Sequence, residues 1–256
     1  MAQIMQNPAF LISALVLAVL PSLVWLFFYL KEDDHPEPRR WLFIIFLMGV
    51  ALAPLVIFLE MVLAKFFGYL NLPQAAETMM LLIFIAPLVE EIAKYGVVHL
   101  ALNKNPVLDE PVDGMIYLAV AALGFAAIEN VFAIFSYIPT GASGYLGATL
   151  NFVSLRFISA VALHGLASSI VGYFFAFYYF IKKDVRLIPL GLFIATIFHG
   201  LYNFFISQDN GDFSRIFFTG IVLGGAAILV IYLFNRLKHY KTYQQVVVDE
   251  TIEHKL

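Results

Sequence analysis

The 256-residue sequence contains no cysteine, and this absence removes several kinds of chemistry. Without thiols the chain has no disulfides, no thiolate zinc site and no cysteine nucleophile. Charge is scarce as well, because Asp, Glu, Lys and Arg make up only 13% of the residues, whereas soluble domains contain about 25%. So few charges argue against a water-soluble enzyme, a disordered regulator and a coiled coil.

An excess of positive charge is also missing, since 15 Lys and Arg face 18 Asp and Glu. The chain therefore has no surplus to neutralise phosphates, and we expect no nucleic-acid partner. What the sequence does have is apolar residues, which form 62% of it. Such a composition is typical of a polytopic membrane protein in contact with the lipid bilayer, built as one integral domain.

Continuous apolar runs long enough to cross a bilayer, which takes about 20 residues, occur seven times. They are continuous rather than alternating, which disfavours a β-barrel. The sequence thus predicts an all-α, polytopic transmembrane helix bundle of about seven spans. The runs cover residues 10–30, 41–66, 77–102, 114–137, 152–181, 187–207 and 213–237.

Basic residues predict the orientation of the bundle. Lys and Arg gather after the first, third and fifth runs and in the C-terminal tail. Because cytoplasmic loops carry the excess of Lys and Arg, these loops are assigned to the cytoplasm and the N-terminus to the outside. We expect an integral membrane domain over residues 1–240 and a cytoplasmic tail over 241–256, in a multi-pass protein of the cell membrane.

Ionisable side chains stand out within the predicted spans. Each costs about 2.5–3.5 kcal/mol on insertion scales, so such residues are functional candidates. A helix rises 1.5 Å per residue, which places those on four different spans roughly 18–26 Å above the cytoplasmic ends, in one slab. We therefore expect a single shared cavity. The residues are Glu90, Glu91 and Lys94 in the third run, Glu129 in the fourth, His164 in the fifth, and His199 with Asn203 in the sixth.

Helical spacing adds detail to this cavity. Glu90 and Lys94 are four residues apart and can pair, while Glu91 is expected to point about 100° away. His199 and Asn203 share the same spacing and converge on one spot. A carboxylate can take a proton from water, and His or Asn can stabilise an oxyanion, so the set suits hydrolysis.

Zinc is a second interpretation of the same residues. Glu129, His164 and His199 together form a His₂Glu set, which is a catalytic zinc complement with one open position. No HExxH motif is present, which excludes a zincin-type site. The residues alone leave a zinc mechanism and a metal-free, glutamate-activated water both open.

Four motifs in order give the chain a resemblance to the PrsW family of intramembrane proteases. These are EExxK (Glu90 to Lys94), DEPVDG (Asp109 to Gly114) leading into FxxxE (Phe125 and Glu129), then His164, then HxxxN (His199 and Asn203). The PEPRR stretch from Pro36 to Arg40 also fits the family. The resemblance covers nearly the whole chain.

The resemblance implies a multi-span protease of the CAAX-protease and bacteriocin-processing superfamily. Its substrate would be a single-span, membrane-anchored protein such as an anti-sigma factor, cut near the outer face. Glu90 and Glu91 would be the catalytic acidic pair, with Glu129, His164 and His199 completing the site. The wider superfamily commonly has His where this chain has Glu129, and Arg one position after Lys94, so this chain follows the PrsW branch.

Two other functions use the same polar residues. Chains of Glu, Lys and His in membrane spans also mark proton-coupled carriers, although no clear inverted repeat supports a carrier here. A non-catalytic scaffold could keep a polar core for helix packing.

Overall fold

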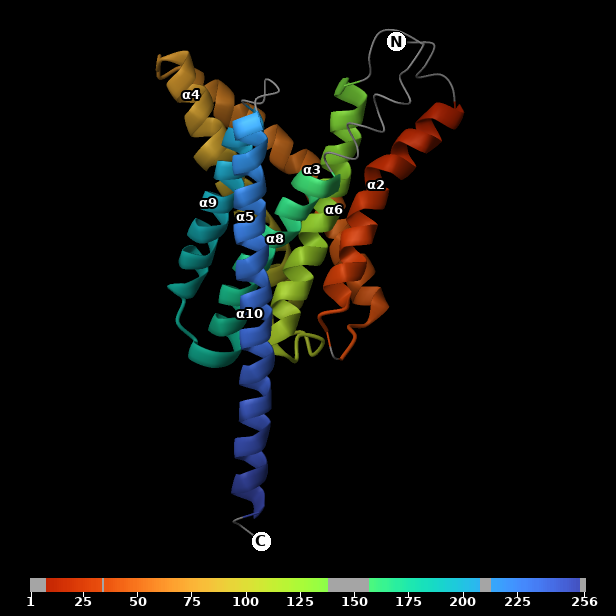
Figure 1. The fold of residues 1–256 in the computed structure, drawn as a ribbon, viewed down its shortest axis with the longest axis vertical. Helices are drawn as coiled ribbons and strands as arrows, with labels where there is room; N and C mark the ends of the chain where they lie inside the picture. The colour runs from red at the N-terminus through yellow and green to blue at the C-terminus, as the bar shows by residue number, and fades with distance from the viewer. Residues whose placement is uncertain (1–7, 34, 138–156, 208–212, 254–256) are drawn as a thin grey trace.

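The computed structural model describes residues 8–33, 35–137, 157–207 and 213–253, and every regular element in these ranges is a helix (Figure 1). The predicted all-α class is therefore confirmed. The helices are α2 (Pro8–Leu30), α3 (Arg39–Gly68), α4 (Gln74–Met80), η1 (Leu81–Ile85), α5 (Ala86–Leu102), α6 (Pro111–Tyr137), η2 (Phe157–Val161), α8 (Ala162–Ala176), η3 (Phe177–Lys182), α9 (Leu187–Ser207) and α10 (Phe213–Glu253).

Helices α6 and α8 form the centre of the bundle, and nearly all their residues from Met115 to Ala127 and from Ala162 to Ala176 are buried. Small residues allow the two helices to touch. A Cβ added at Gly172 would clash with the Gly114 carbonyl oxygen, so Gly172 cannot carry a side chain without moving a helix. Such close backbone contacts are typical of helix packing in membranes.

The outer helices carry the apolar faces that a bilayer requires. Six helices in the described residues are long and apolar enough to cross a membrane, with mean hydropathy between 1.5 and 2.9. Large apolar side chains point outward from them, because lipid rather than water is the surrounding solvent. Examples are Val16, Phe27, Phe43, Leu55, Phe193 and Ile228. These features make the chain a multi-pass membrane protein.

The predicted third span, 77–102, differs from the other six. It forms a continuous but irregular helix of three parts, α4, η1 and α5, in which η1 is a π-helical segment. It carries Glu90, Glu91 and Lys94, and it is not among the six helices that are long and apolar enough to cross a membrane. The fifth predicted span, 152–181, begins at Phe157 in the structure, and residues 152–156 lie outside the described ranges.

The loops predicted to face the cytoplasm lie at one end of the bundle, the end from which α10 projects (Figure 1). Loop residues around His35 and Asn105 line one hollow, and the Lys104 amide donates to the Tyr179 hydroxyl at the end of η3. Helix α2 starts at the opposite end. Helix α10 continues to Glu253, so the tail expected over 241–256 begins as a helical extension.

Candidate active site

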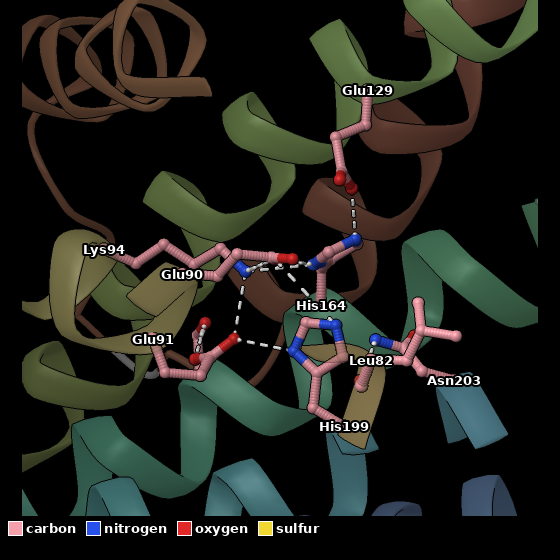
Figure 2. A network of polar contacts seen from close by, with 9 residues as sticks. Leu82, Glu90, Glu91, Lys94, Glu129, His164, His199 and Asn203 are labelled. Carbon is pink, nitrogen blue, oxygen red and sulfur yellow. Dashed lines mark hydrogen bonds and ion pairs between the residues drawn. The ribbon is translucent and has the colours of Figure 1, made fainter. Parts of the chain in front are cut away.

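Three helices converge on one polar cluster, and a fourth helix, α6, contributes Glu129, which contacts His164 (Figure 2). Helix α5 supplies Glu90, Glu91 and Lys94, α8 supplies His164, and α9 supplies His199. Every one of these residues is at least 95% buried. The structure therefore brings together, from three helices far apart in the sequence, the groups that the sequence placed at one membrane depth.

Lys94 lies at the centre of the cluster. Its Nζ is 3.0 Å from Glu90 Oε2, 2.9 Å from Glu91 Oε1 and 3.0 Å from His164 Nδ1. The expected contact with Glu90 is present, and Glu91, expected about 100° away around the helix, contacts the same ammonium. The long lysine side chain reaches back one turn and bridges both carboxylates, so the ammonium uses all three of its donors.

Glu91 is held from three sides and is fully buried. Besides Lys94, Ser168 Oγ donates to its Oε2 at 2.6 Å, and His199 Nδ1 lies 3.3 Å from its Oε1. Four lone-pair sites on a carboxylate suit such multiple donation. Glu91 therefore connects α5 to both α8 and α9, and its oxygens are already engaged.

His164 is oriented by two partners on opposite sides of its ring. Because the Lys94 ammonium is a donor, Nδ1 accepts and Nε2 carries the proton. That Nε2 lies 2.5 Å from Glu129 Oε2 on α6. The ring stands almost perpendicular to that of His199, with centroids 5.0 Å apart. Glu129 thus reaches the cluster through His164.

Asn203 joins α9 to the π-helical segment η1. Its Nδ2 donates to the Leu82 carbonyl oxygen at 3.2 Å, and π-helical segments leave carbonyls displaced from their usual partners. One turn earlier, Gly200 lies against the backbone of Ile83 so closely that a Cβ could not fit. These contacts fix α9 against the start of α5 and so fix His199 beside the two glutamates.

A cavity of about 290 Å³ opens beside the cluster. Its polar lining includes Glu90, Glu129, His164, His199 and Asn203, with Ala160, Leu163 and Ile206 among the apolar residues. Glu91 and Lys94 do not line it. The two adjacent glutamates therefore differ, since Glu90 faces the cavity and Glu91 lies behind it.

Sequence reasoning missed three polar residues at the site, Ser159, Ser168 and Tyr202. Ser168 donates to Glu91. Tyr202 donates to Ser159 Oγ at 2.9 Å, and both line the cavity. The spacing of Ser168, four residues after His164, was a signal that could have placed its hydroxyl on the same face of α8.

The family assignment agrees with this geometry. The sequence model of the PrsW family of intramembrane metalloproteases matches residues 37–235. The chain belongs to this family. The proteins named Protease PrsW from Geobacillus kaustophilus and Clostridioides difficile are 32% and 31% identical over 181 and 196 residues, covering 70% and 75% of this chain and 73% and 78% of theirs. Protease PrsW from Bacillus subtilis is 25% identical over 184 residues, 71% of this chain and 76% of its own. No solved structure matches.

A PrsW-family chain is an intramembrane peptidase, and the family description raises the question of a metal. Glu90, Glu91, His164 and His199 each offer one ligand atom, and these atoms lie within 4.8 Å of one another. Two imidazoles and two carboxylates are donors that suit zinc. The chemistry of the donor set therefore fits a metal ion. Glu129, which the sequence pattern included as a ligand, is not in this group and instead contacts the far nitrogen of His164.

Proposed function

We propose that this chain hydrolyses a peptide bond of a single-span, membrane-anchored protein at the Glu90 side of the cavity. The observation that supports this is a hollow within the helix bundle, lined by two carboxylates, two imidazoles and a carboxamide. A substrate segment must lie within the membrane to reach such a site. By the family resemblance, an anti-sigma-factor-like protein has the required topology.

Glu90 is the proposed general base, because it is the glutamate of the pair that faces the cavity. Its carboxylate removes a proton from water while the water oxygen bonds to the substrate carbonyl carbon. The carbon–nitrogen bond then breaks, and the proton held by Glu90 passes to the leaving amine. Water is thus consumed, and two shorter peptides are formed.

His199 and Asn203 are the proposed stabilisers of the developing oxyanion. When both ring nitrogens of His199 carry protons, Nδ1 donates to Glu91 and Nε2 remains for the cavity. The amide of Asn203 has two N–H donors, of which one binds Leu82 and the other, without a partner among the described residues, is proposed to bind the substrate. Donors held in place before the reaction stabilise the new charge without reorganisation.

Glu91, Lys94 and Glu129 are proposed to position these groups. Glu91 fixes the ring of His199, and Lys94 balances the charge of both glutamates. Glu129 fixes the tautomer of His164 with Nδ1 facing the cluster, as carboxylates commonly do for ligand histidines.

A zinc ion, when bound, would lower the pKa of its water and polarise the substrate carbonyl. Glu90, Glu91, His164 and His199 are the residues that would hold it. The His₂Glu set of Glu129, His164 and His199 remains the alternative proposed from the sequence. The roles given above to Glu90 as general base and to His199 as oxyanion donor describe the metal-free alternative, because a residue that holds the ion gives its lone pair to the metal.

The decisive experiment uses the purified full-length chain in detergent, with a tagged single-span protein as substrate. Wild type should produce two fragments. Glu90→Gln should lose cleavage by about 10²–10⁴-fold, the usual contribution of a general base, while keeping its thermal unfolding temperature. Glu32→Gln is the matched control, because Glu32 is half exposed and lies outside the cavity. Unchanged cleavage by Glu90→Gln contradicts the proposal, and solute transport without cleavage points to a carrier.

A further inference from the structure

The Lys94 ammonium occupies the space that the candidate metal ligands share. Three of the four residues in the donor group, Glu90, Glu91 and His164, each place an acceptor atom 2.9–3.0 Å from Nζ. Lys94 is fully buried, so it cannot reach water from this position. The cluster thus contains a cation that is covalently tethered to the helix carrying both glutamates.

An ammonium and a metal ion need the same lone pairs. Zinc binds carboxylate oxygen and imidazole nitrogen at about 2.0–2.2 Å, and each lone pair used in this way is lost to Lys94. Two positive charges a few ångströms apart also repel strongly where water is excluded. Metal binding therefore requires the ammonium to withdraw from the centre of the cluster.

An aromatic ring opposes that withdrawal. Lys94 Nζ lies 4.5 Å from the centroid of the Phe125 ring on α6, and Phe125 is itself fully buried. Cation–π attraction is strongest at such desolvated sites. The ammonium is therefore held at the centre by three acceptors and by the ring.

From this arrangement we propose that Lys94 is a built-in competitor that sets the affinity of the Glu90–Glu91–His164–His199 cluster for zinc. Removal of the ammonium frees the lone pairs of three ligand residues. It also eliminates one positive charge that would repel the metal ion, so the affinity for zinc should rise. The inference rests on the proposed function only in taking this cluster as the reactive site. It assigns to Lys94 a role that ordinary ion pairing does not include.

The test measures zinc binding to the full-length protein in detergent, with Zn²⁺ and a competing chromophoric chelator and no peptide substrate. Lys94→Gln should bind zinc about 10–100-fold more tightly than wild type, the range seen when groups around a metal site are changed. Phe125→Leu keeps the ammonium but removes the ring, so its gain should be smaller, about threefold. Lys65→Gln, at the exposed end of α3, should bind like wild type.

Two further measurements check that the gain arises at this cluster and that it can be read even in an unstable variant. His164→Ala added to Lys94→Gln should cancel the gain in zinc affinity. The second group of candidate metal ligands in the described residues, Glu37, Asp109 and Asp113, contains no histidine, so a gain that arose there would persist. If Lys94→Gln is unstable, the rise in its unfolding temperature with added Zn²⁺ still reports affinity and should exceed that of wild type. Equal or weaker zinc binding by Lys94→Gln overturns the proposal. Because no peptide is cleaved in this assay, a failure of the proposed protease activity is a separate result.

Discussion

Two buried groups of carboxylates lie at different levels of this bundle, and they are neutralised differently. In the central cluster, Glu90 and Glu91 face the ammonium of Lys94 (Figure 2). At the predicted cytoplasmic end, Glu37 meets Asp113. Among the described residues, no Lys or Arg forms an ion pair with Glu37 or Asp113. One group is balanced by a tethered cation, whereas in the other a carboxyl group and a phenol hydroxyl bind the carboxyl group of Glu37.

The cytoplasmic group is built from the loop before α3 and the first turn of α6. Tyr117 Oη donates to Glu37 Oε2 at 2.5 Å, and Glu37 and Asp113 are hydrogen-bonded to each other. Burial raises the pKa of Glu37 above its ordinary value of 4.5, although the hydrogen bonds from Asp113 and Tyr117 offset part of this. A proton between two carboxyl groups suits a structural contact. A general base must be ionised, and within a membrane that state requires a nearby cation.

The largest expected effect comes from removing that cation. Lys94→Met leaves two buried carboxylates uncompensated, and breaking a buried ion pair in this way costs about 3–5 kcal/mol of unfolding free energy. Unfolding in mixed micelles would measure the loss. Adding Glu91→Gln to Lys94→Met should restore part of the stability, since one uncompensated charge disappears. A Lys94→Met protein as stable as wild type would show that the cluster does not depend on its ammonium.

Part of this comparison could be predicted from the sequence. The apolar runs predicted the helices, and helix rise placed Glu90, Glu129, His164 and His199 at one depth. Periodicity could not show that Lys94 bridges both glutamates, because side-chain reach depends on helices packed around it. It also could not show the π-helical segment η1, since π-helices have no simple sequence signal.

The DEPVDG and PEPRR stretches were recognised only as family features. The sequence does not place the two stretches in contact, because a full helix, a long irregular helix and a loop separate them. The structure places Glu37 of the second stretch against Asp113 of the first, at the start of α6. Their contact depends on tertiary packing at one end of the bundle.

A smaller loss is expected when the cytoplasmic group is broken. Tyr117→Phe removes the hydroxyl that donates to Glu37, and a buried acceptor without its donor costs about 1–3 kcal/mol. Thermal unfolding of the purified variant would measure this. Tyr95→Phe is the control, because Tyr95 is only half buried and its contact with His99 is long, at 3.4 Å. Equal losses in both variants would show that a missing hydroxyl, rather than the acidic contact, is being measured.

The two groups should also differ in their response to pH. The raised pKa of Glu37 means that the folded state binds its proton more tightly than the unfolded state. This stabilisation is complete below 4.5 and is lost as pH rises through the raised pKa. Glu37→Gln should therefore flatten the fall in unfolding temperature with rising pH. Asp113 is hydrogen-bonded to Glu37 and faces it together with Asp33 and Asp109, so the difference between the two curves reports the Glu37–Asp113 pair as a unit.

Trypsin would check the same prediction locally, by cutting after Lys31 or Lys104 at rising pH. The loop at 183–186 serves as an internal reference, since Arg186 is exposed and pairs only locally with Asp184. Faster cutting near Lys31 in wild type, but not in Glu37→Gln, is the expected result. Parallel curves for the two proteins would exclude a shared proton at this contact.

The smallest effect is expected where a cation and a carboxylate meet in the open. Lys238 on α10 lies 3.0 Å from Glu32, and the two side chains are 26% and 47% exposed. The distance equals that of Lys94 to Glu90, so the two pairs differ in burial rather than in geometry. Exposed pairs contribute about 0–1 kcal/mol, and Lys238→Gln should change the unfolding free energy by no more than this. If Lys238→Gln lost as much unfolding free energy as Lys94→Met, burial would not explain why the central cluster depends on its lysine.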